Sequence, residues 1–301
     1  MPSRRSLLTG AAAVGGALLW GGPAAQAHPR DRPQAAQVLD IVTGEDGFTA
    51  PARAFAGPVP FRLRTTSSRT GHVGVVRLRA GATEAQFRAR LRRVFTTEGQ
   101  DNIQAAHALM ATAELYGGGI THPGTDICFT APLPPGRYLV LEYLDFEGPR
   151  GRDPQSGQEH LRSLTVHPTK TEAARSSCAT LTAVDIPGQG PRFLLDGHIT
   201  PGGPLRYVNR MQNQVDEAMF CPITDDSVTE RDIQAFFDGT GGAPPFDLSK
   251  WLGTPPLSPG REVLLTTPLA PGRYAAITWV SSIHDARPLS MHGQHRIVVV
   301  R

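Results

Sequence analysis

Residues 123–138 read PGTDICFTAPLPPGRY, and residues 259–274 read PGREVLLTTPLAPGRY. Nine of the sixteen positions are identical, with a constant offset of 136 residues and no gap. A string that ends in the pattern TxPLxPGRY rarely recurs by accident, and self-similarity at a fixed period is the sequence signature of a repeated structural unit. The two strings therefore predict either a duplicated domain or one turn that the fold uses twice.

The match between the two parts of the chain continues upstream of these strings at an offset of 146 residues. AGPVPFRL at residues 56–63 aligns with GGPLRYVN at residues 202–209, and ATEAQFRARL from Ala82 aligns with VTERDIQAFF from Val228. The first copy therefore holds ten extra residues between these landmarks and the repeated string. We expect these extra residues in a helical stretch over residues 101–116.

These alignments divide the chain into two units. The first spans residues 37–168 and the second spans residues 179–301, with a polar linker at residues 169–178 between them. Self-similarity over this length indicates duplicated domains that share one order of elements.

Each unit is expected to consist of short strands joined by turns. Val59, Phe61 and Leu63 alternate with Pro60 and Arg62, which is the period-2 pattern of a half-buried strand. The chain is rich in turn formers, with 32 Gly and 27 Pro. Proline at the end of a strand, followed by glycine, is typical of a tight reversal. We therefore predict an all-β fold with short helical insertions, built as two tandem Greek-key β-sandwich domains.

Both units also contain the start signal of a short helix. Thr83 and Gln86 form a capping-box pattern ahead of apolar residues spaced as one helical face. Thr229 and Asp232 repeat the pattern in the second unit. We expect a helix after each of these two threonines.

The first 27 residues are typical of a twin-arginine-type export signal. Arg4 and Arg5 precede an apolar stretch that is too short to span a bilayer, and the string AQA ending at Ala27 offers small residues to a signal peptidase. We expect cleavage after Ala27, a linker at residues 28–36, and a secreted, extracytoplasmic protein with no membrane anchor after cleavage.

The charge pattern gives no indication of a nucleic-acid partner. Loss of Arg4 and Arg5 with the signal lowers the formal net charge from +3 to +1, and no basic block stands out in the rest of the chain. A nucleic-acid or anionic membrane surface needs such a block. A protein or small-ligand partner remains the open alternative.

Three cysteines follow the predicted signal: Cys128, Cys178 and Cys221. An exported protein can form a disulfide, and Cys178 with Cys221 is the pair that we favour because each lies beside a strand-like run. The alternative is that all three are small buried apolar residues. No CxxC or Cys/His ligand spacing is present, so structural zinc is not predicted.

The order of these parts resembles that of the plastocyanin-like cupredoxins, in particular the bacterial extracytoplasmic ones. The resemblance rests on the AGPVPFRLR strand, a nearby histidine, the GxTxxxF helix, a GG turn and LxPGRY before a last hairpin, and it covers nearly the whole mature chain. It implies two cupredoxin-like β-sandwiches. In such proteins one copper ion is held by two His, a Cys thiolate and usually a weak axial Met.

The resemblance places few copper ligands in the first unit. His72 stands at the early histidine position, but Glu142 occupies the cysteine position, four residues after Tyr138. The later histidine position falls near Gln155, in a loop that contains no Met.

The second unit also lacks the expected ligands. The early histidine position aligns with Ala218, and Thr278 occupies the cysteine position, four residues after Tyr274. Leu289 and Gln294 stand roughly where His and Met would be. Without a thiolate in either unit, the resemblance implies the fold but not a type 1 copper site.

A metal site without a thiolate is the alternative reading. His284, His292 and His295, with Met291, follow the second PGRY string, and His72 stands alone in the first unit. Imidazoles bind copper and zinc. Against this, polar hairpin tips often collect histidines, and His292 and His295 would face opposite ways on an extended strand.

Other catalytic chemistry finds little support. His28 would become the mature N-terminus, and an N-terminal His resembles the copper histidine brace of the polysaccharide monooxygenases, but the polar tail that follows offers no rigid second ligand. No GxSxG, HExxH or phosphate loop is present, and acidic pairs such as Asp225 and Asp226 are typical of solvated turns.

We therefore expect an exported, non-catalytic cupredoxin-like binding or structural protein that lacks a type 1 copper site and needs no cofactor. The alternative is an extracytoplasmic copper- or zinc-binding or redox protein with non-thiolate His ligands, including a copper-dependent oxidoreductase.

Overall fold

The computed structural model describes residues 37–45, 47–147, 159–169, 177, 179–266 and 268–301. The predicted export signal at 1–27, the linker at 28–36 and most of the linker at 169–178 lie outside the described residues, so these expectations stay predictions. No helix among the described residues is long and apolar enough to cross a membrane.

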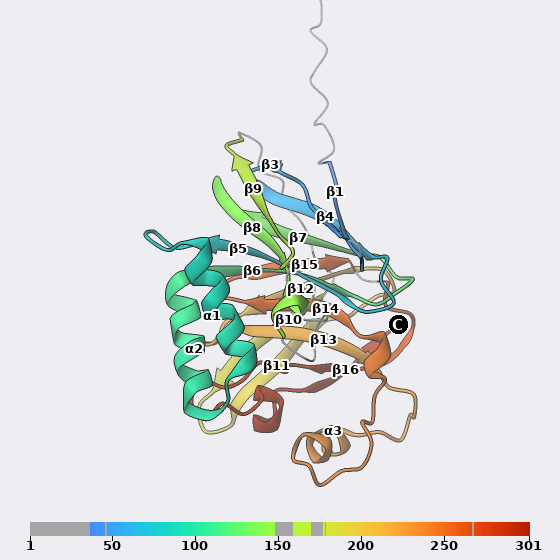
Figure 1. Cartoon of the computed structure of the whole chain (residues 1–301). Coiled ribbons are helices and arrows are strands. Elements are labelled where there is room, and N and C mark those ends of the chain that lie inside the picture. The colour runs from blue at the N-terminus through green and yellow to red at the C-terminus, as the bar shows by residue number, and fades with distance from the viewer. Residues whose placement is uncertain (1–36, 46, 148–158, 170–176, 178, 267) are drawn as a thin grey trace, which may run out of the picture. The chain divides into compact units, whose positions relative to one another are not determined.

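Strands dominate both halves of the described chain (Figure 1). The first half contains β1 (Leu39–Thr43), β2 (Phe48–Thr49), β3 (Arg53–Phe55), β4 (Gly57–Thr65), β5 (Gly71–Leu78), β6 (Ala113–Thr121), β7 (Ile127–Leu133), β8 (Gly136–Glu142) and β9 (Leu161–His167). The second half contains β10 (Ala179–Ile186), β11 (Gly190–Gly197), β12 (Pro204–Asn209), β13 (Asp216–Pro222), β14 (Leu252–Leu257), β15 (Glu262–Thr266), β16 (Gly272–Ile277) and β17 (Arg296–Val300).

The two halves share one strand topology. In the first half, one sheet has the order β2-β1-β4-β7 with β1 parallel to β4, and the other has the order β6-β5-β8-β9-β3, in which the edge strand β3 is parallel to β9 and has no counterpart in the second half. In the second half, the orders are β11-β10-β12-β15, with β10 parallel to β12, and β14-β13-β16-β17. The chain is therefore two tandem cupredoxin-like Greek-key β-sandwiches, as the sequence predicts.

The sheets of the two halves are continuous. β7 pairs with β15, and β6 pairs with β14, both antiparallel. Among the described residues this joins the sheets into one of eight strands, sheet A, and one of nine strands, sheet B. Each joining strand pairs with its own counterpart in the other half, as in the self-complementary contact of a twofold dimer.

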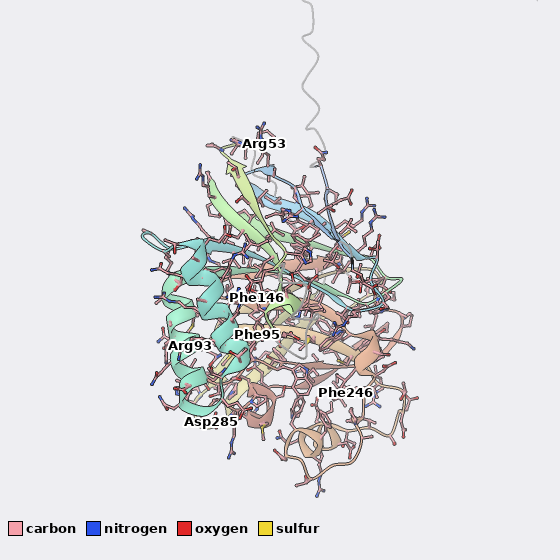
Figure 2. All side chains as sticks on the ribbon, viewed as in Figure 1. Arg53, Arg93, Phe95, Phe146, Phe246 and Asp285 are labelled. Carbon is pink, nitrogen blue, oxygen red and sulfur yellow. The ribbon has the colours of Figure 1, made fainter. Side chains whose placement is uncertain are left out.

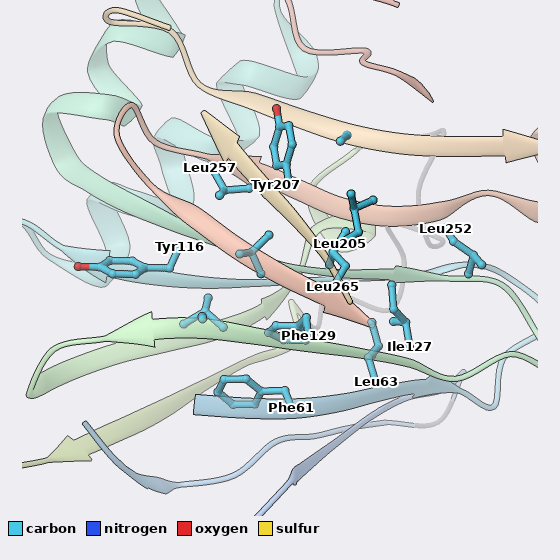
Figure 3. Close-up of a cluster of buried hydrophobic side chains, with 14 of the residues drawn as sticks. Phe61, Leu63, Tyr116, Ile127, Phe129, Leu205, Tyr207, Leu252, Leu257 and Leu265 are labelled. Atoms are coloured by element: carbon cyan, nitrogen blue, oxygen red, sulfur yellow. The ribbon is translucent and has the colours of Figure 1, made fainter. Parts of the chain in front are cut away.

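A shared apolar core lies between sheets A and B (Figure 3). Phe61 on β4 and Phe129 on β7 stack with ring centroids 4.9 Å apart. Leu205 and Leu265 extend the same cluster into the second half. Because residues of both halves bury their apolar surface in one cluster, the halves stabilise each other.

Helices cover the outer face of sheet B. α1 (Glu84–Thr96) begins after Thr83, and α3 (Glu230–Phe237) begins after Thr229. Both have the predicted capping box. α2 (Gly99–Thr112) runs beside α1 (Figure 1).

Each helical element is held by its own apolar cluster. Phe87 of α1 lies in one cluster with Phe146 of the 3₁₀ turn η1 (Tyr143–Phe146), and Ile233 of α3 lies in another with Phe246. Figure 2 labels Phe146 and Phe246.

The predicted helix over residues 101–116 is wrong at its end. α2 ends at Thr112, and the following residues belong to β6, where Leu115 pairs with Val76 and Ala113 with Leu78. The buried ladder to β5 thus overrides the local helical preference of this stretch.

The repeated PGRY string is one turn used twice. β7 and β15 lie in sheet A, and β8 and β16 lie in sheet B, so the turn carries the chain across the sandwich. Gly136 and Gly272 have φ angles of 154° and 152°, in a region essentially restricted to glycine. The Tyr138 hydroxyl donates to the Pro134 carbonyl at 2.7 Å, and the Tyr274 hydroxyl donates to the Ala270 carbonyl at 3.1 Å.

Candidate metal centre

The first copper position is occupied by a buried carboxylate. Glu142 ends β8 and pairs with Val73 on β5. Its side chain is fully buried, and Oε1 accepts a hydrogen bond from the His72 backbone N–H at 2.8 Å. The carboxylate at the cysteine position thus ties the end of β8 to the start of β5.

The His72 ring faces away from this position. Val73 belongs to the core between the sheets, whereas the His72 ring lies 5.3 Å from the ring of Tyr143, which packs on the outer face of sheet B. Neither ring nitrogen has a hydrogen-bond partner among the described residues. Burial lowers the pKa of His72 to about 3, so the imidazole is neutral at pH 7.

The register of the second half corrects the alignment by one residue. β13 pairs with β16 through Met219 and Ile277, so Ala218 stands at the level of Thr278. Ala218 is therefore the counterpart of Val73, and Glu217 is the counterpart of His72. The sequence alignment had paired His72 with Ala218, which is wrong because offsets taken from sequence ignore the shorter turn between the strands.

A buried polar network fills the second copper position. The Tyr207 hydroxyl donates to Asp216 Oδ2 at 2.5 Å, and the Gln294 side-chain amide donates to the same oxygen. The Thr278 side chain also hydrogen bonds this carboxyl group, and Ser290 Oγ donates to the Thr278 carbonyl at 2.8 Å. All five side chains are fully buried.

The two neighbouring acids of β13 have raised pKa values. Burial raises the pKa of Asp216 to about 7, although its hydrogen bonds act in the opposite direction. Burial, together with the nearby Asp216 charge, raises the pKa of Glu217 to about 8. Glu217 Oε1 accepts a hydrogen bond from the Trp279 backbone N–H at 2.9 Å. Desolvation therefore favours the protonated form of both acids.

These donor sets do not fit a type 1 copper ion. At the first position the side chains that share the inner face are Val73 and Glu142, and at the second they are Ala218, Thr278 and the Asp216 network. The loop residues 148–158, including Gln155, lie outside the described residues, and they contain no Cys, His or Met. A thiolate and two converging imidazoles are absent from the described part of both positions.

The predicted histidine group of the second half is not brought together. His295 uses both ring nitrogens on α3, with Glu230 Oε2 at 2.8 Å and Gln234 Oε1 at 2.9 Å. His292 Nε2 lies 3.1 Å from Asp285, and His284 is exposed.

The fourth member of that group, Met291, contacts α3 through its main chain: its carbonyl accepts a hydrogen bond from Gln234 Nε2. Within the described ranges, no group of three or more His, Cys, Asp or Glu side chains is placed to hold a metal ion. His28 lies outside these ranges.

The predicted disulfide cannot be placed as a pair. The Cys221 sulfur is buried with the α3 cluster on the outer face of sheet B, and burial raises the pKa of its thiol form. Cys128 forms no disulfide with Cys221. Cys178 lies outside the described residues, so its pairing with Cys221 stays a prediction.

Sequence reasoning missed the acids Asp216 and Glu217. Their signal is two adjacent acids at the start of the apolar run AMFC, where a strand places side chains on both buried faces. Their partner Tyr207 lies on β12, in the other sheet, so no local sequence pattern indicates this contact.

Comparisons with known proteins return copper proteins at low identity. The chain is similar to a multicopper oxidase, at 12% identity and a TM-score of 0.23, over 88% of this chain and 89% of that one. It is similar to a Cu-containing nitrite reductase from Thermus scotoductus SA-01, at 11% identity and a TM-score of 0.22, over 88% and 61%. It is also similar to auracyanin A, a blue copper protein from Chloroflexus aurantiacus, at 14% identity and a TM-score of 0.27, over 44% and 100%. No family model and no curated protein matches the chain. Because the TM-scores are low, the fold assignment rests on the strand order and register of the two halves.

Proposed function

We propose that the chain is an exported, non-catalytic binding protein built on a tandem cupredoxin-like frame that holds no type 1 copper. The observation that carries this proposal is the chemistry of the two copper positions. Each buries hydrogen-bonded oxygen groups, Glu142 in the first half and the Asp216–Thr278 network in the second, where a copper thiolate would be required.

The hydrogen bonds at these two positions support a structural role for the buried polar side chains there. A buried carboxyl group without partners is costly, whereas Glu142 accepts the His72 main-chain N–H of β5 and Asp216 accepts hydrogen bonds from Tyr207 and Gln294. The polar groups therefore perform the strand-linking role that a bound metal ion performs in a metalloprotein. A ligand or partner would then bind on the surface of the two sandwiches and not at the copper positions.

Metal analysis of the exported protein tests the proposal. The full chain is purified after export in a copper-replete host, and its copper and zinc content is measured together with visible absorption and copper EPR. We expect well below one equivalent of either metal and no thiolate-to-copper band. Stoichiometric copper or zinc would overturn the proposal.

A titration separates the alternative with non-thiolate ligands. Copper(II) and zinc(II) are added to the wild type and to a His292→Ala/His295→Ala variant. We expect weak binding that the double variant leaves unchanged. Tight binding that disappears in the variant would favour the histidine site instead.

A further inference from the structure

A groove lies where the two halves meet, on the side of α2. Its volume is about 560 Å³, and its wall is formed by α2 and β6 of the first half together with loops of the second half. Met110, Ala111, Pro259 and Ile283 provide apolar surface, and polar groups lie beside them. This volume is in the range of pockets that hold small organic ligands.

The one acid in the wall of this groove, Glu114, is already neutralised. Arg261 Nη2 donates to its Oε1 at 2.5 Å, and the Tyr116 hydroxyl donates to its Oε2 at 2.9 Å. Burial acts to raise the pKa of Glu114, but these two hydrogen bonds outweigh burial and hold the pKa below its usual value. Arg261 also lies over the Tyr116 ring, 4.4 Å from its centroid. The pair therefore adds no net charge to the groove.

Two arginines beside the groove form no close ion pair among the described residues, although the Glu114 charge helps to raise the pKa of Arg77 and the Arg79 charge helps to lower the pKa of Glu114. The exposed Arg79 donates through Nε to the Met110 carbonyl at 2.8 Å, which orients the guanidinium, and its terminal nitrogens make no hydrogen bond within the described chain. Arg77 lines an adjoining pocket of about 270 Å³, with its guanidinium 5.8 Å from the centroid of the Tyr138 ring. A fixed guanidinium with free terminal N–H groups is suited to a carboxylate.

The rim of the groove also holds an asparagine in a turn. Asn213 has a φ angle of 54°, in the left-handed region that Asn adopts more readily than other non-glycine residues. Asn213 lines the groove and offers an amide to a polar ligand.

We propose that this groove binds a small organic carboxylate, with its carboxylate on the terminal nitrogens of Arg79 and its apolar body against Met110 and Ile283. The inference rests on the proposed binding role and names its ligand class. The proposed function and the proposed ligand site can fail separately, because the metal content tests the absence of copper and the ligand titration tests the groove.

Calorimetric titration of the full chain with butyrate, hexanoate and phenylacetate tests the site, with hexanamide as the uncharged match for hexanoate. We expect at least one of the three acids to bind, hexanamide to bind at least tenfold more weakly than hexanoate, and affinity for the acids to fall as salt is raised. Binding of none of the three acids, or equal binding of hexanoate and hexanamide, would overturn the proposal.

Two groove variants and a control locate the site. Arg79→Gln removes the charge and should weaken binding about tenfold or more, and Ala111→Trp should abolish it by filling the groove. Arg93→Gln changes an exposed arginine on α1 (Figure 2) and should leave binding unchanged. Circular dichroism confirms that each variant is folded. Equal affinity of Arg79→Gln and Arg93→Gln would reject this assignment.

Discussion

The two halves of the molecule have the same backbone at their turns and different chemistry at their copper positions. The PGRY glycines differ by only 2° in φ, and both tyrosines donate to the carbonyl four residues earlier. By contrast, the first half places a single carboxylate, Glu142, where the second half places a network of five side chains.

This difference separates what the frame requires from what it tolerates. A turn between two sheets admits few φ/ψ combinations, so the same residues recur in both copies. A buried polar position only requires that its groups find partners, and several side-chain sets satisfy that condition. Four changes test whether the two halves are equivalent where their backbones agree and distinct where their side chains differ.

The largest expected effect concerns two glycines where strands approach closely. A Cβ on Gly118 would lie 1.9 Å from the Val73 carbonyl oxygen, and a Cβ on Gly253 would lie 2.1 Å from the Ala218 carbonyl oxygen. Because both obstacles are main-chain atoms, relief requires a shift of the sheet. Gly118→Ala and Gly253→Ala should each lower the free energy of unfolding by about 4 kcal/mol in urea denaturation.

The chain offers a matched control for each of these substitutions. A Cβ on Gly47 or Gly242 would meet nothing within 4 Å, so the corresponding alanine variants should change stability by less than about 0.5 kcal/mol. If only one of Gly118→Ala and Gly253→Ala were destabilising, the close strand contacts at these two glycines would not be equivalent in the two halves.

The features of the fold that follow from local or repeated patterns could be predicted from the sequence. The doubled string gave the two units, and the threonines at 83 and 229 gave the starts of α1 and α3, because a capping box is a local hydrogen-bond pattern.

The features that depend on contacts between distant strands could not be predicted. The face of the His72 ring depends on a one-residue register, and the Asp216–Tyr207 hydrogen bond joins two sheets. The groove requires both halves in place. Sequence reasoning therefore named the residues at the positions that the resemblance implies, but not which side chains share them.

The second prediction concerns the acid that only the second half carries at the position of His72. An unfolded Glu217 ionises near pH 4.5, whereas the folded protein retains its proton up to about pH 8. Between these values the folded state holds the extra proton, so stability falls as pH rises. Glu217→Gln keeps an acceptor for the Trp279 N–H and removes this loss. At pH 9 the variant should be more stable than the wild type by a few kcal/mol, and at pH 4 the two should be nearly equal.

Urea denaturation at several pH values measures this difference. His72 titrates in both proteins and cancels in the difference, whereas Asp216 is coupled to Glu217, so the difference reports the proton that the acid pair holds through Glu217. Asp185→Asn, an exposed acid on β10, is the control and should give a flat difference. A Glu217→Gln difference that does not grow with pH would mean that the acid is ionised in the folded protein.

The third prediction concerns the glycines of the repeated turn. A Cβ on Gly272 meets no atom within 4 Å, so Gly272→Ala introduces backbone strain alone, whereas a Cβ on Gly136 comes within 3.3 Å of the flexible Arg77 guanidinium. Both variants should lose about 2 kcal/mol of unfolding free energy because alanine disfavours a φ near 150°. A neutral Gly272→Ala would show that the turn can adopt another conformation.

The smallest effect concerns the tyrosine hydroxyls of the same turn. Tyr138→Phe and Tyr274→Phe each remove the hydroxyl's hydrogen bond to the turn carbonyl and retain the ring, so each should cost about 1 kcal/mol in thermal or urea unfolding. The shorter bond, 2.7 Å at Tyr138 against 3.1 Å at Tyr274, predicts the larger loss in the first half. The Tyr138 ring also packs edge-on against Tyr116, which phenylalanine preserves, but the Tyr138 hydroxyl hydrogen bonds the Tyr116 side chain as well, which is a second reason for the larger loss in the first half. A larger loss of unfolding free energy for Tyr274→Phe would contradict this prediction. It would mean that the turn of the second half depends more on its hydrogen bond, although that bond is the longer one.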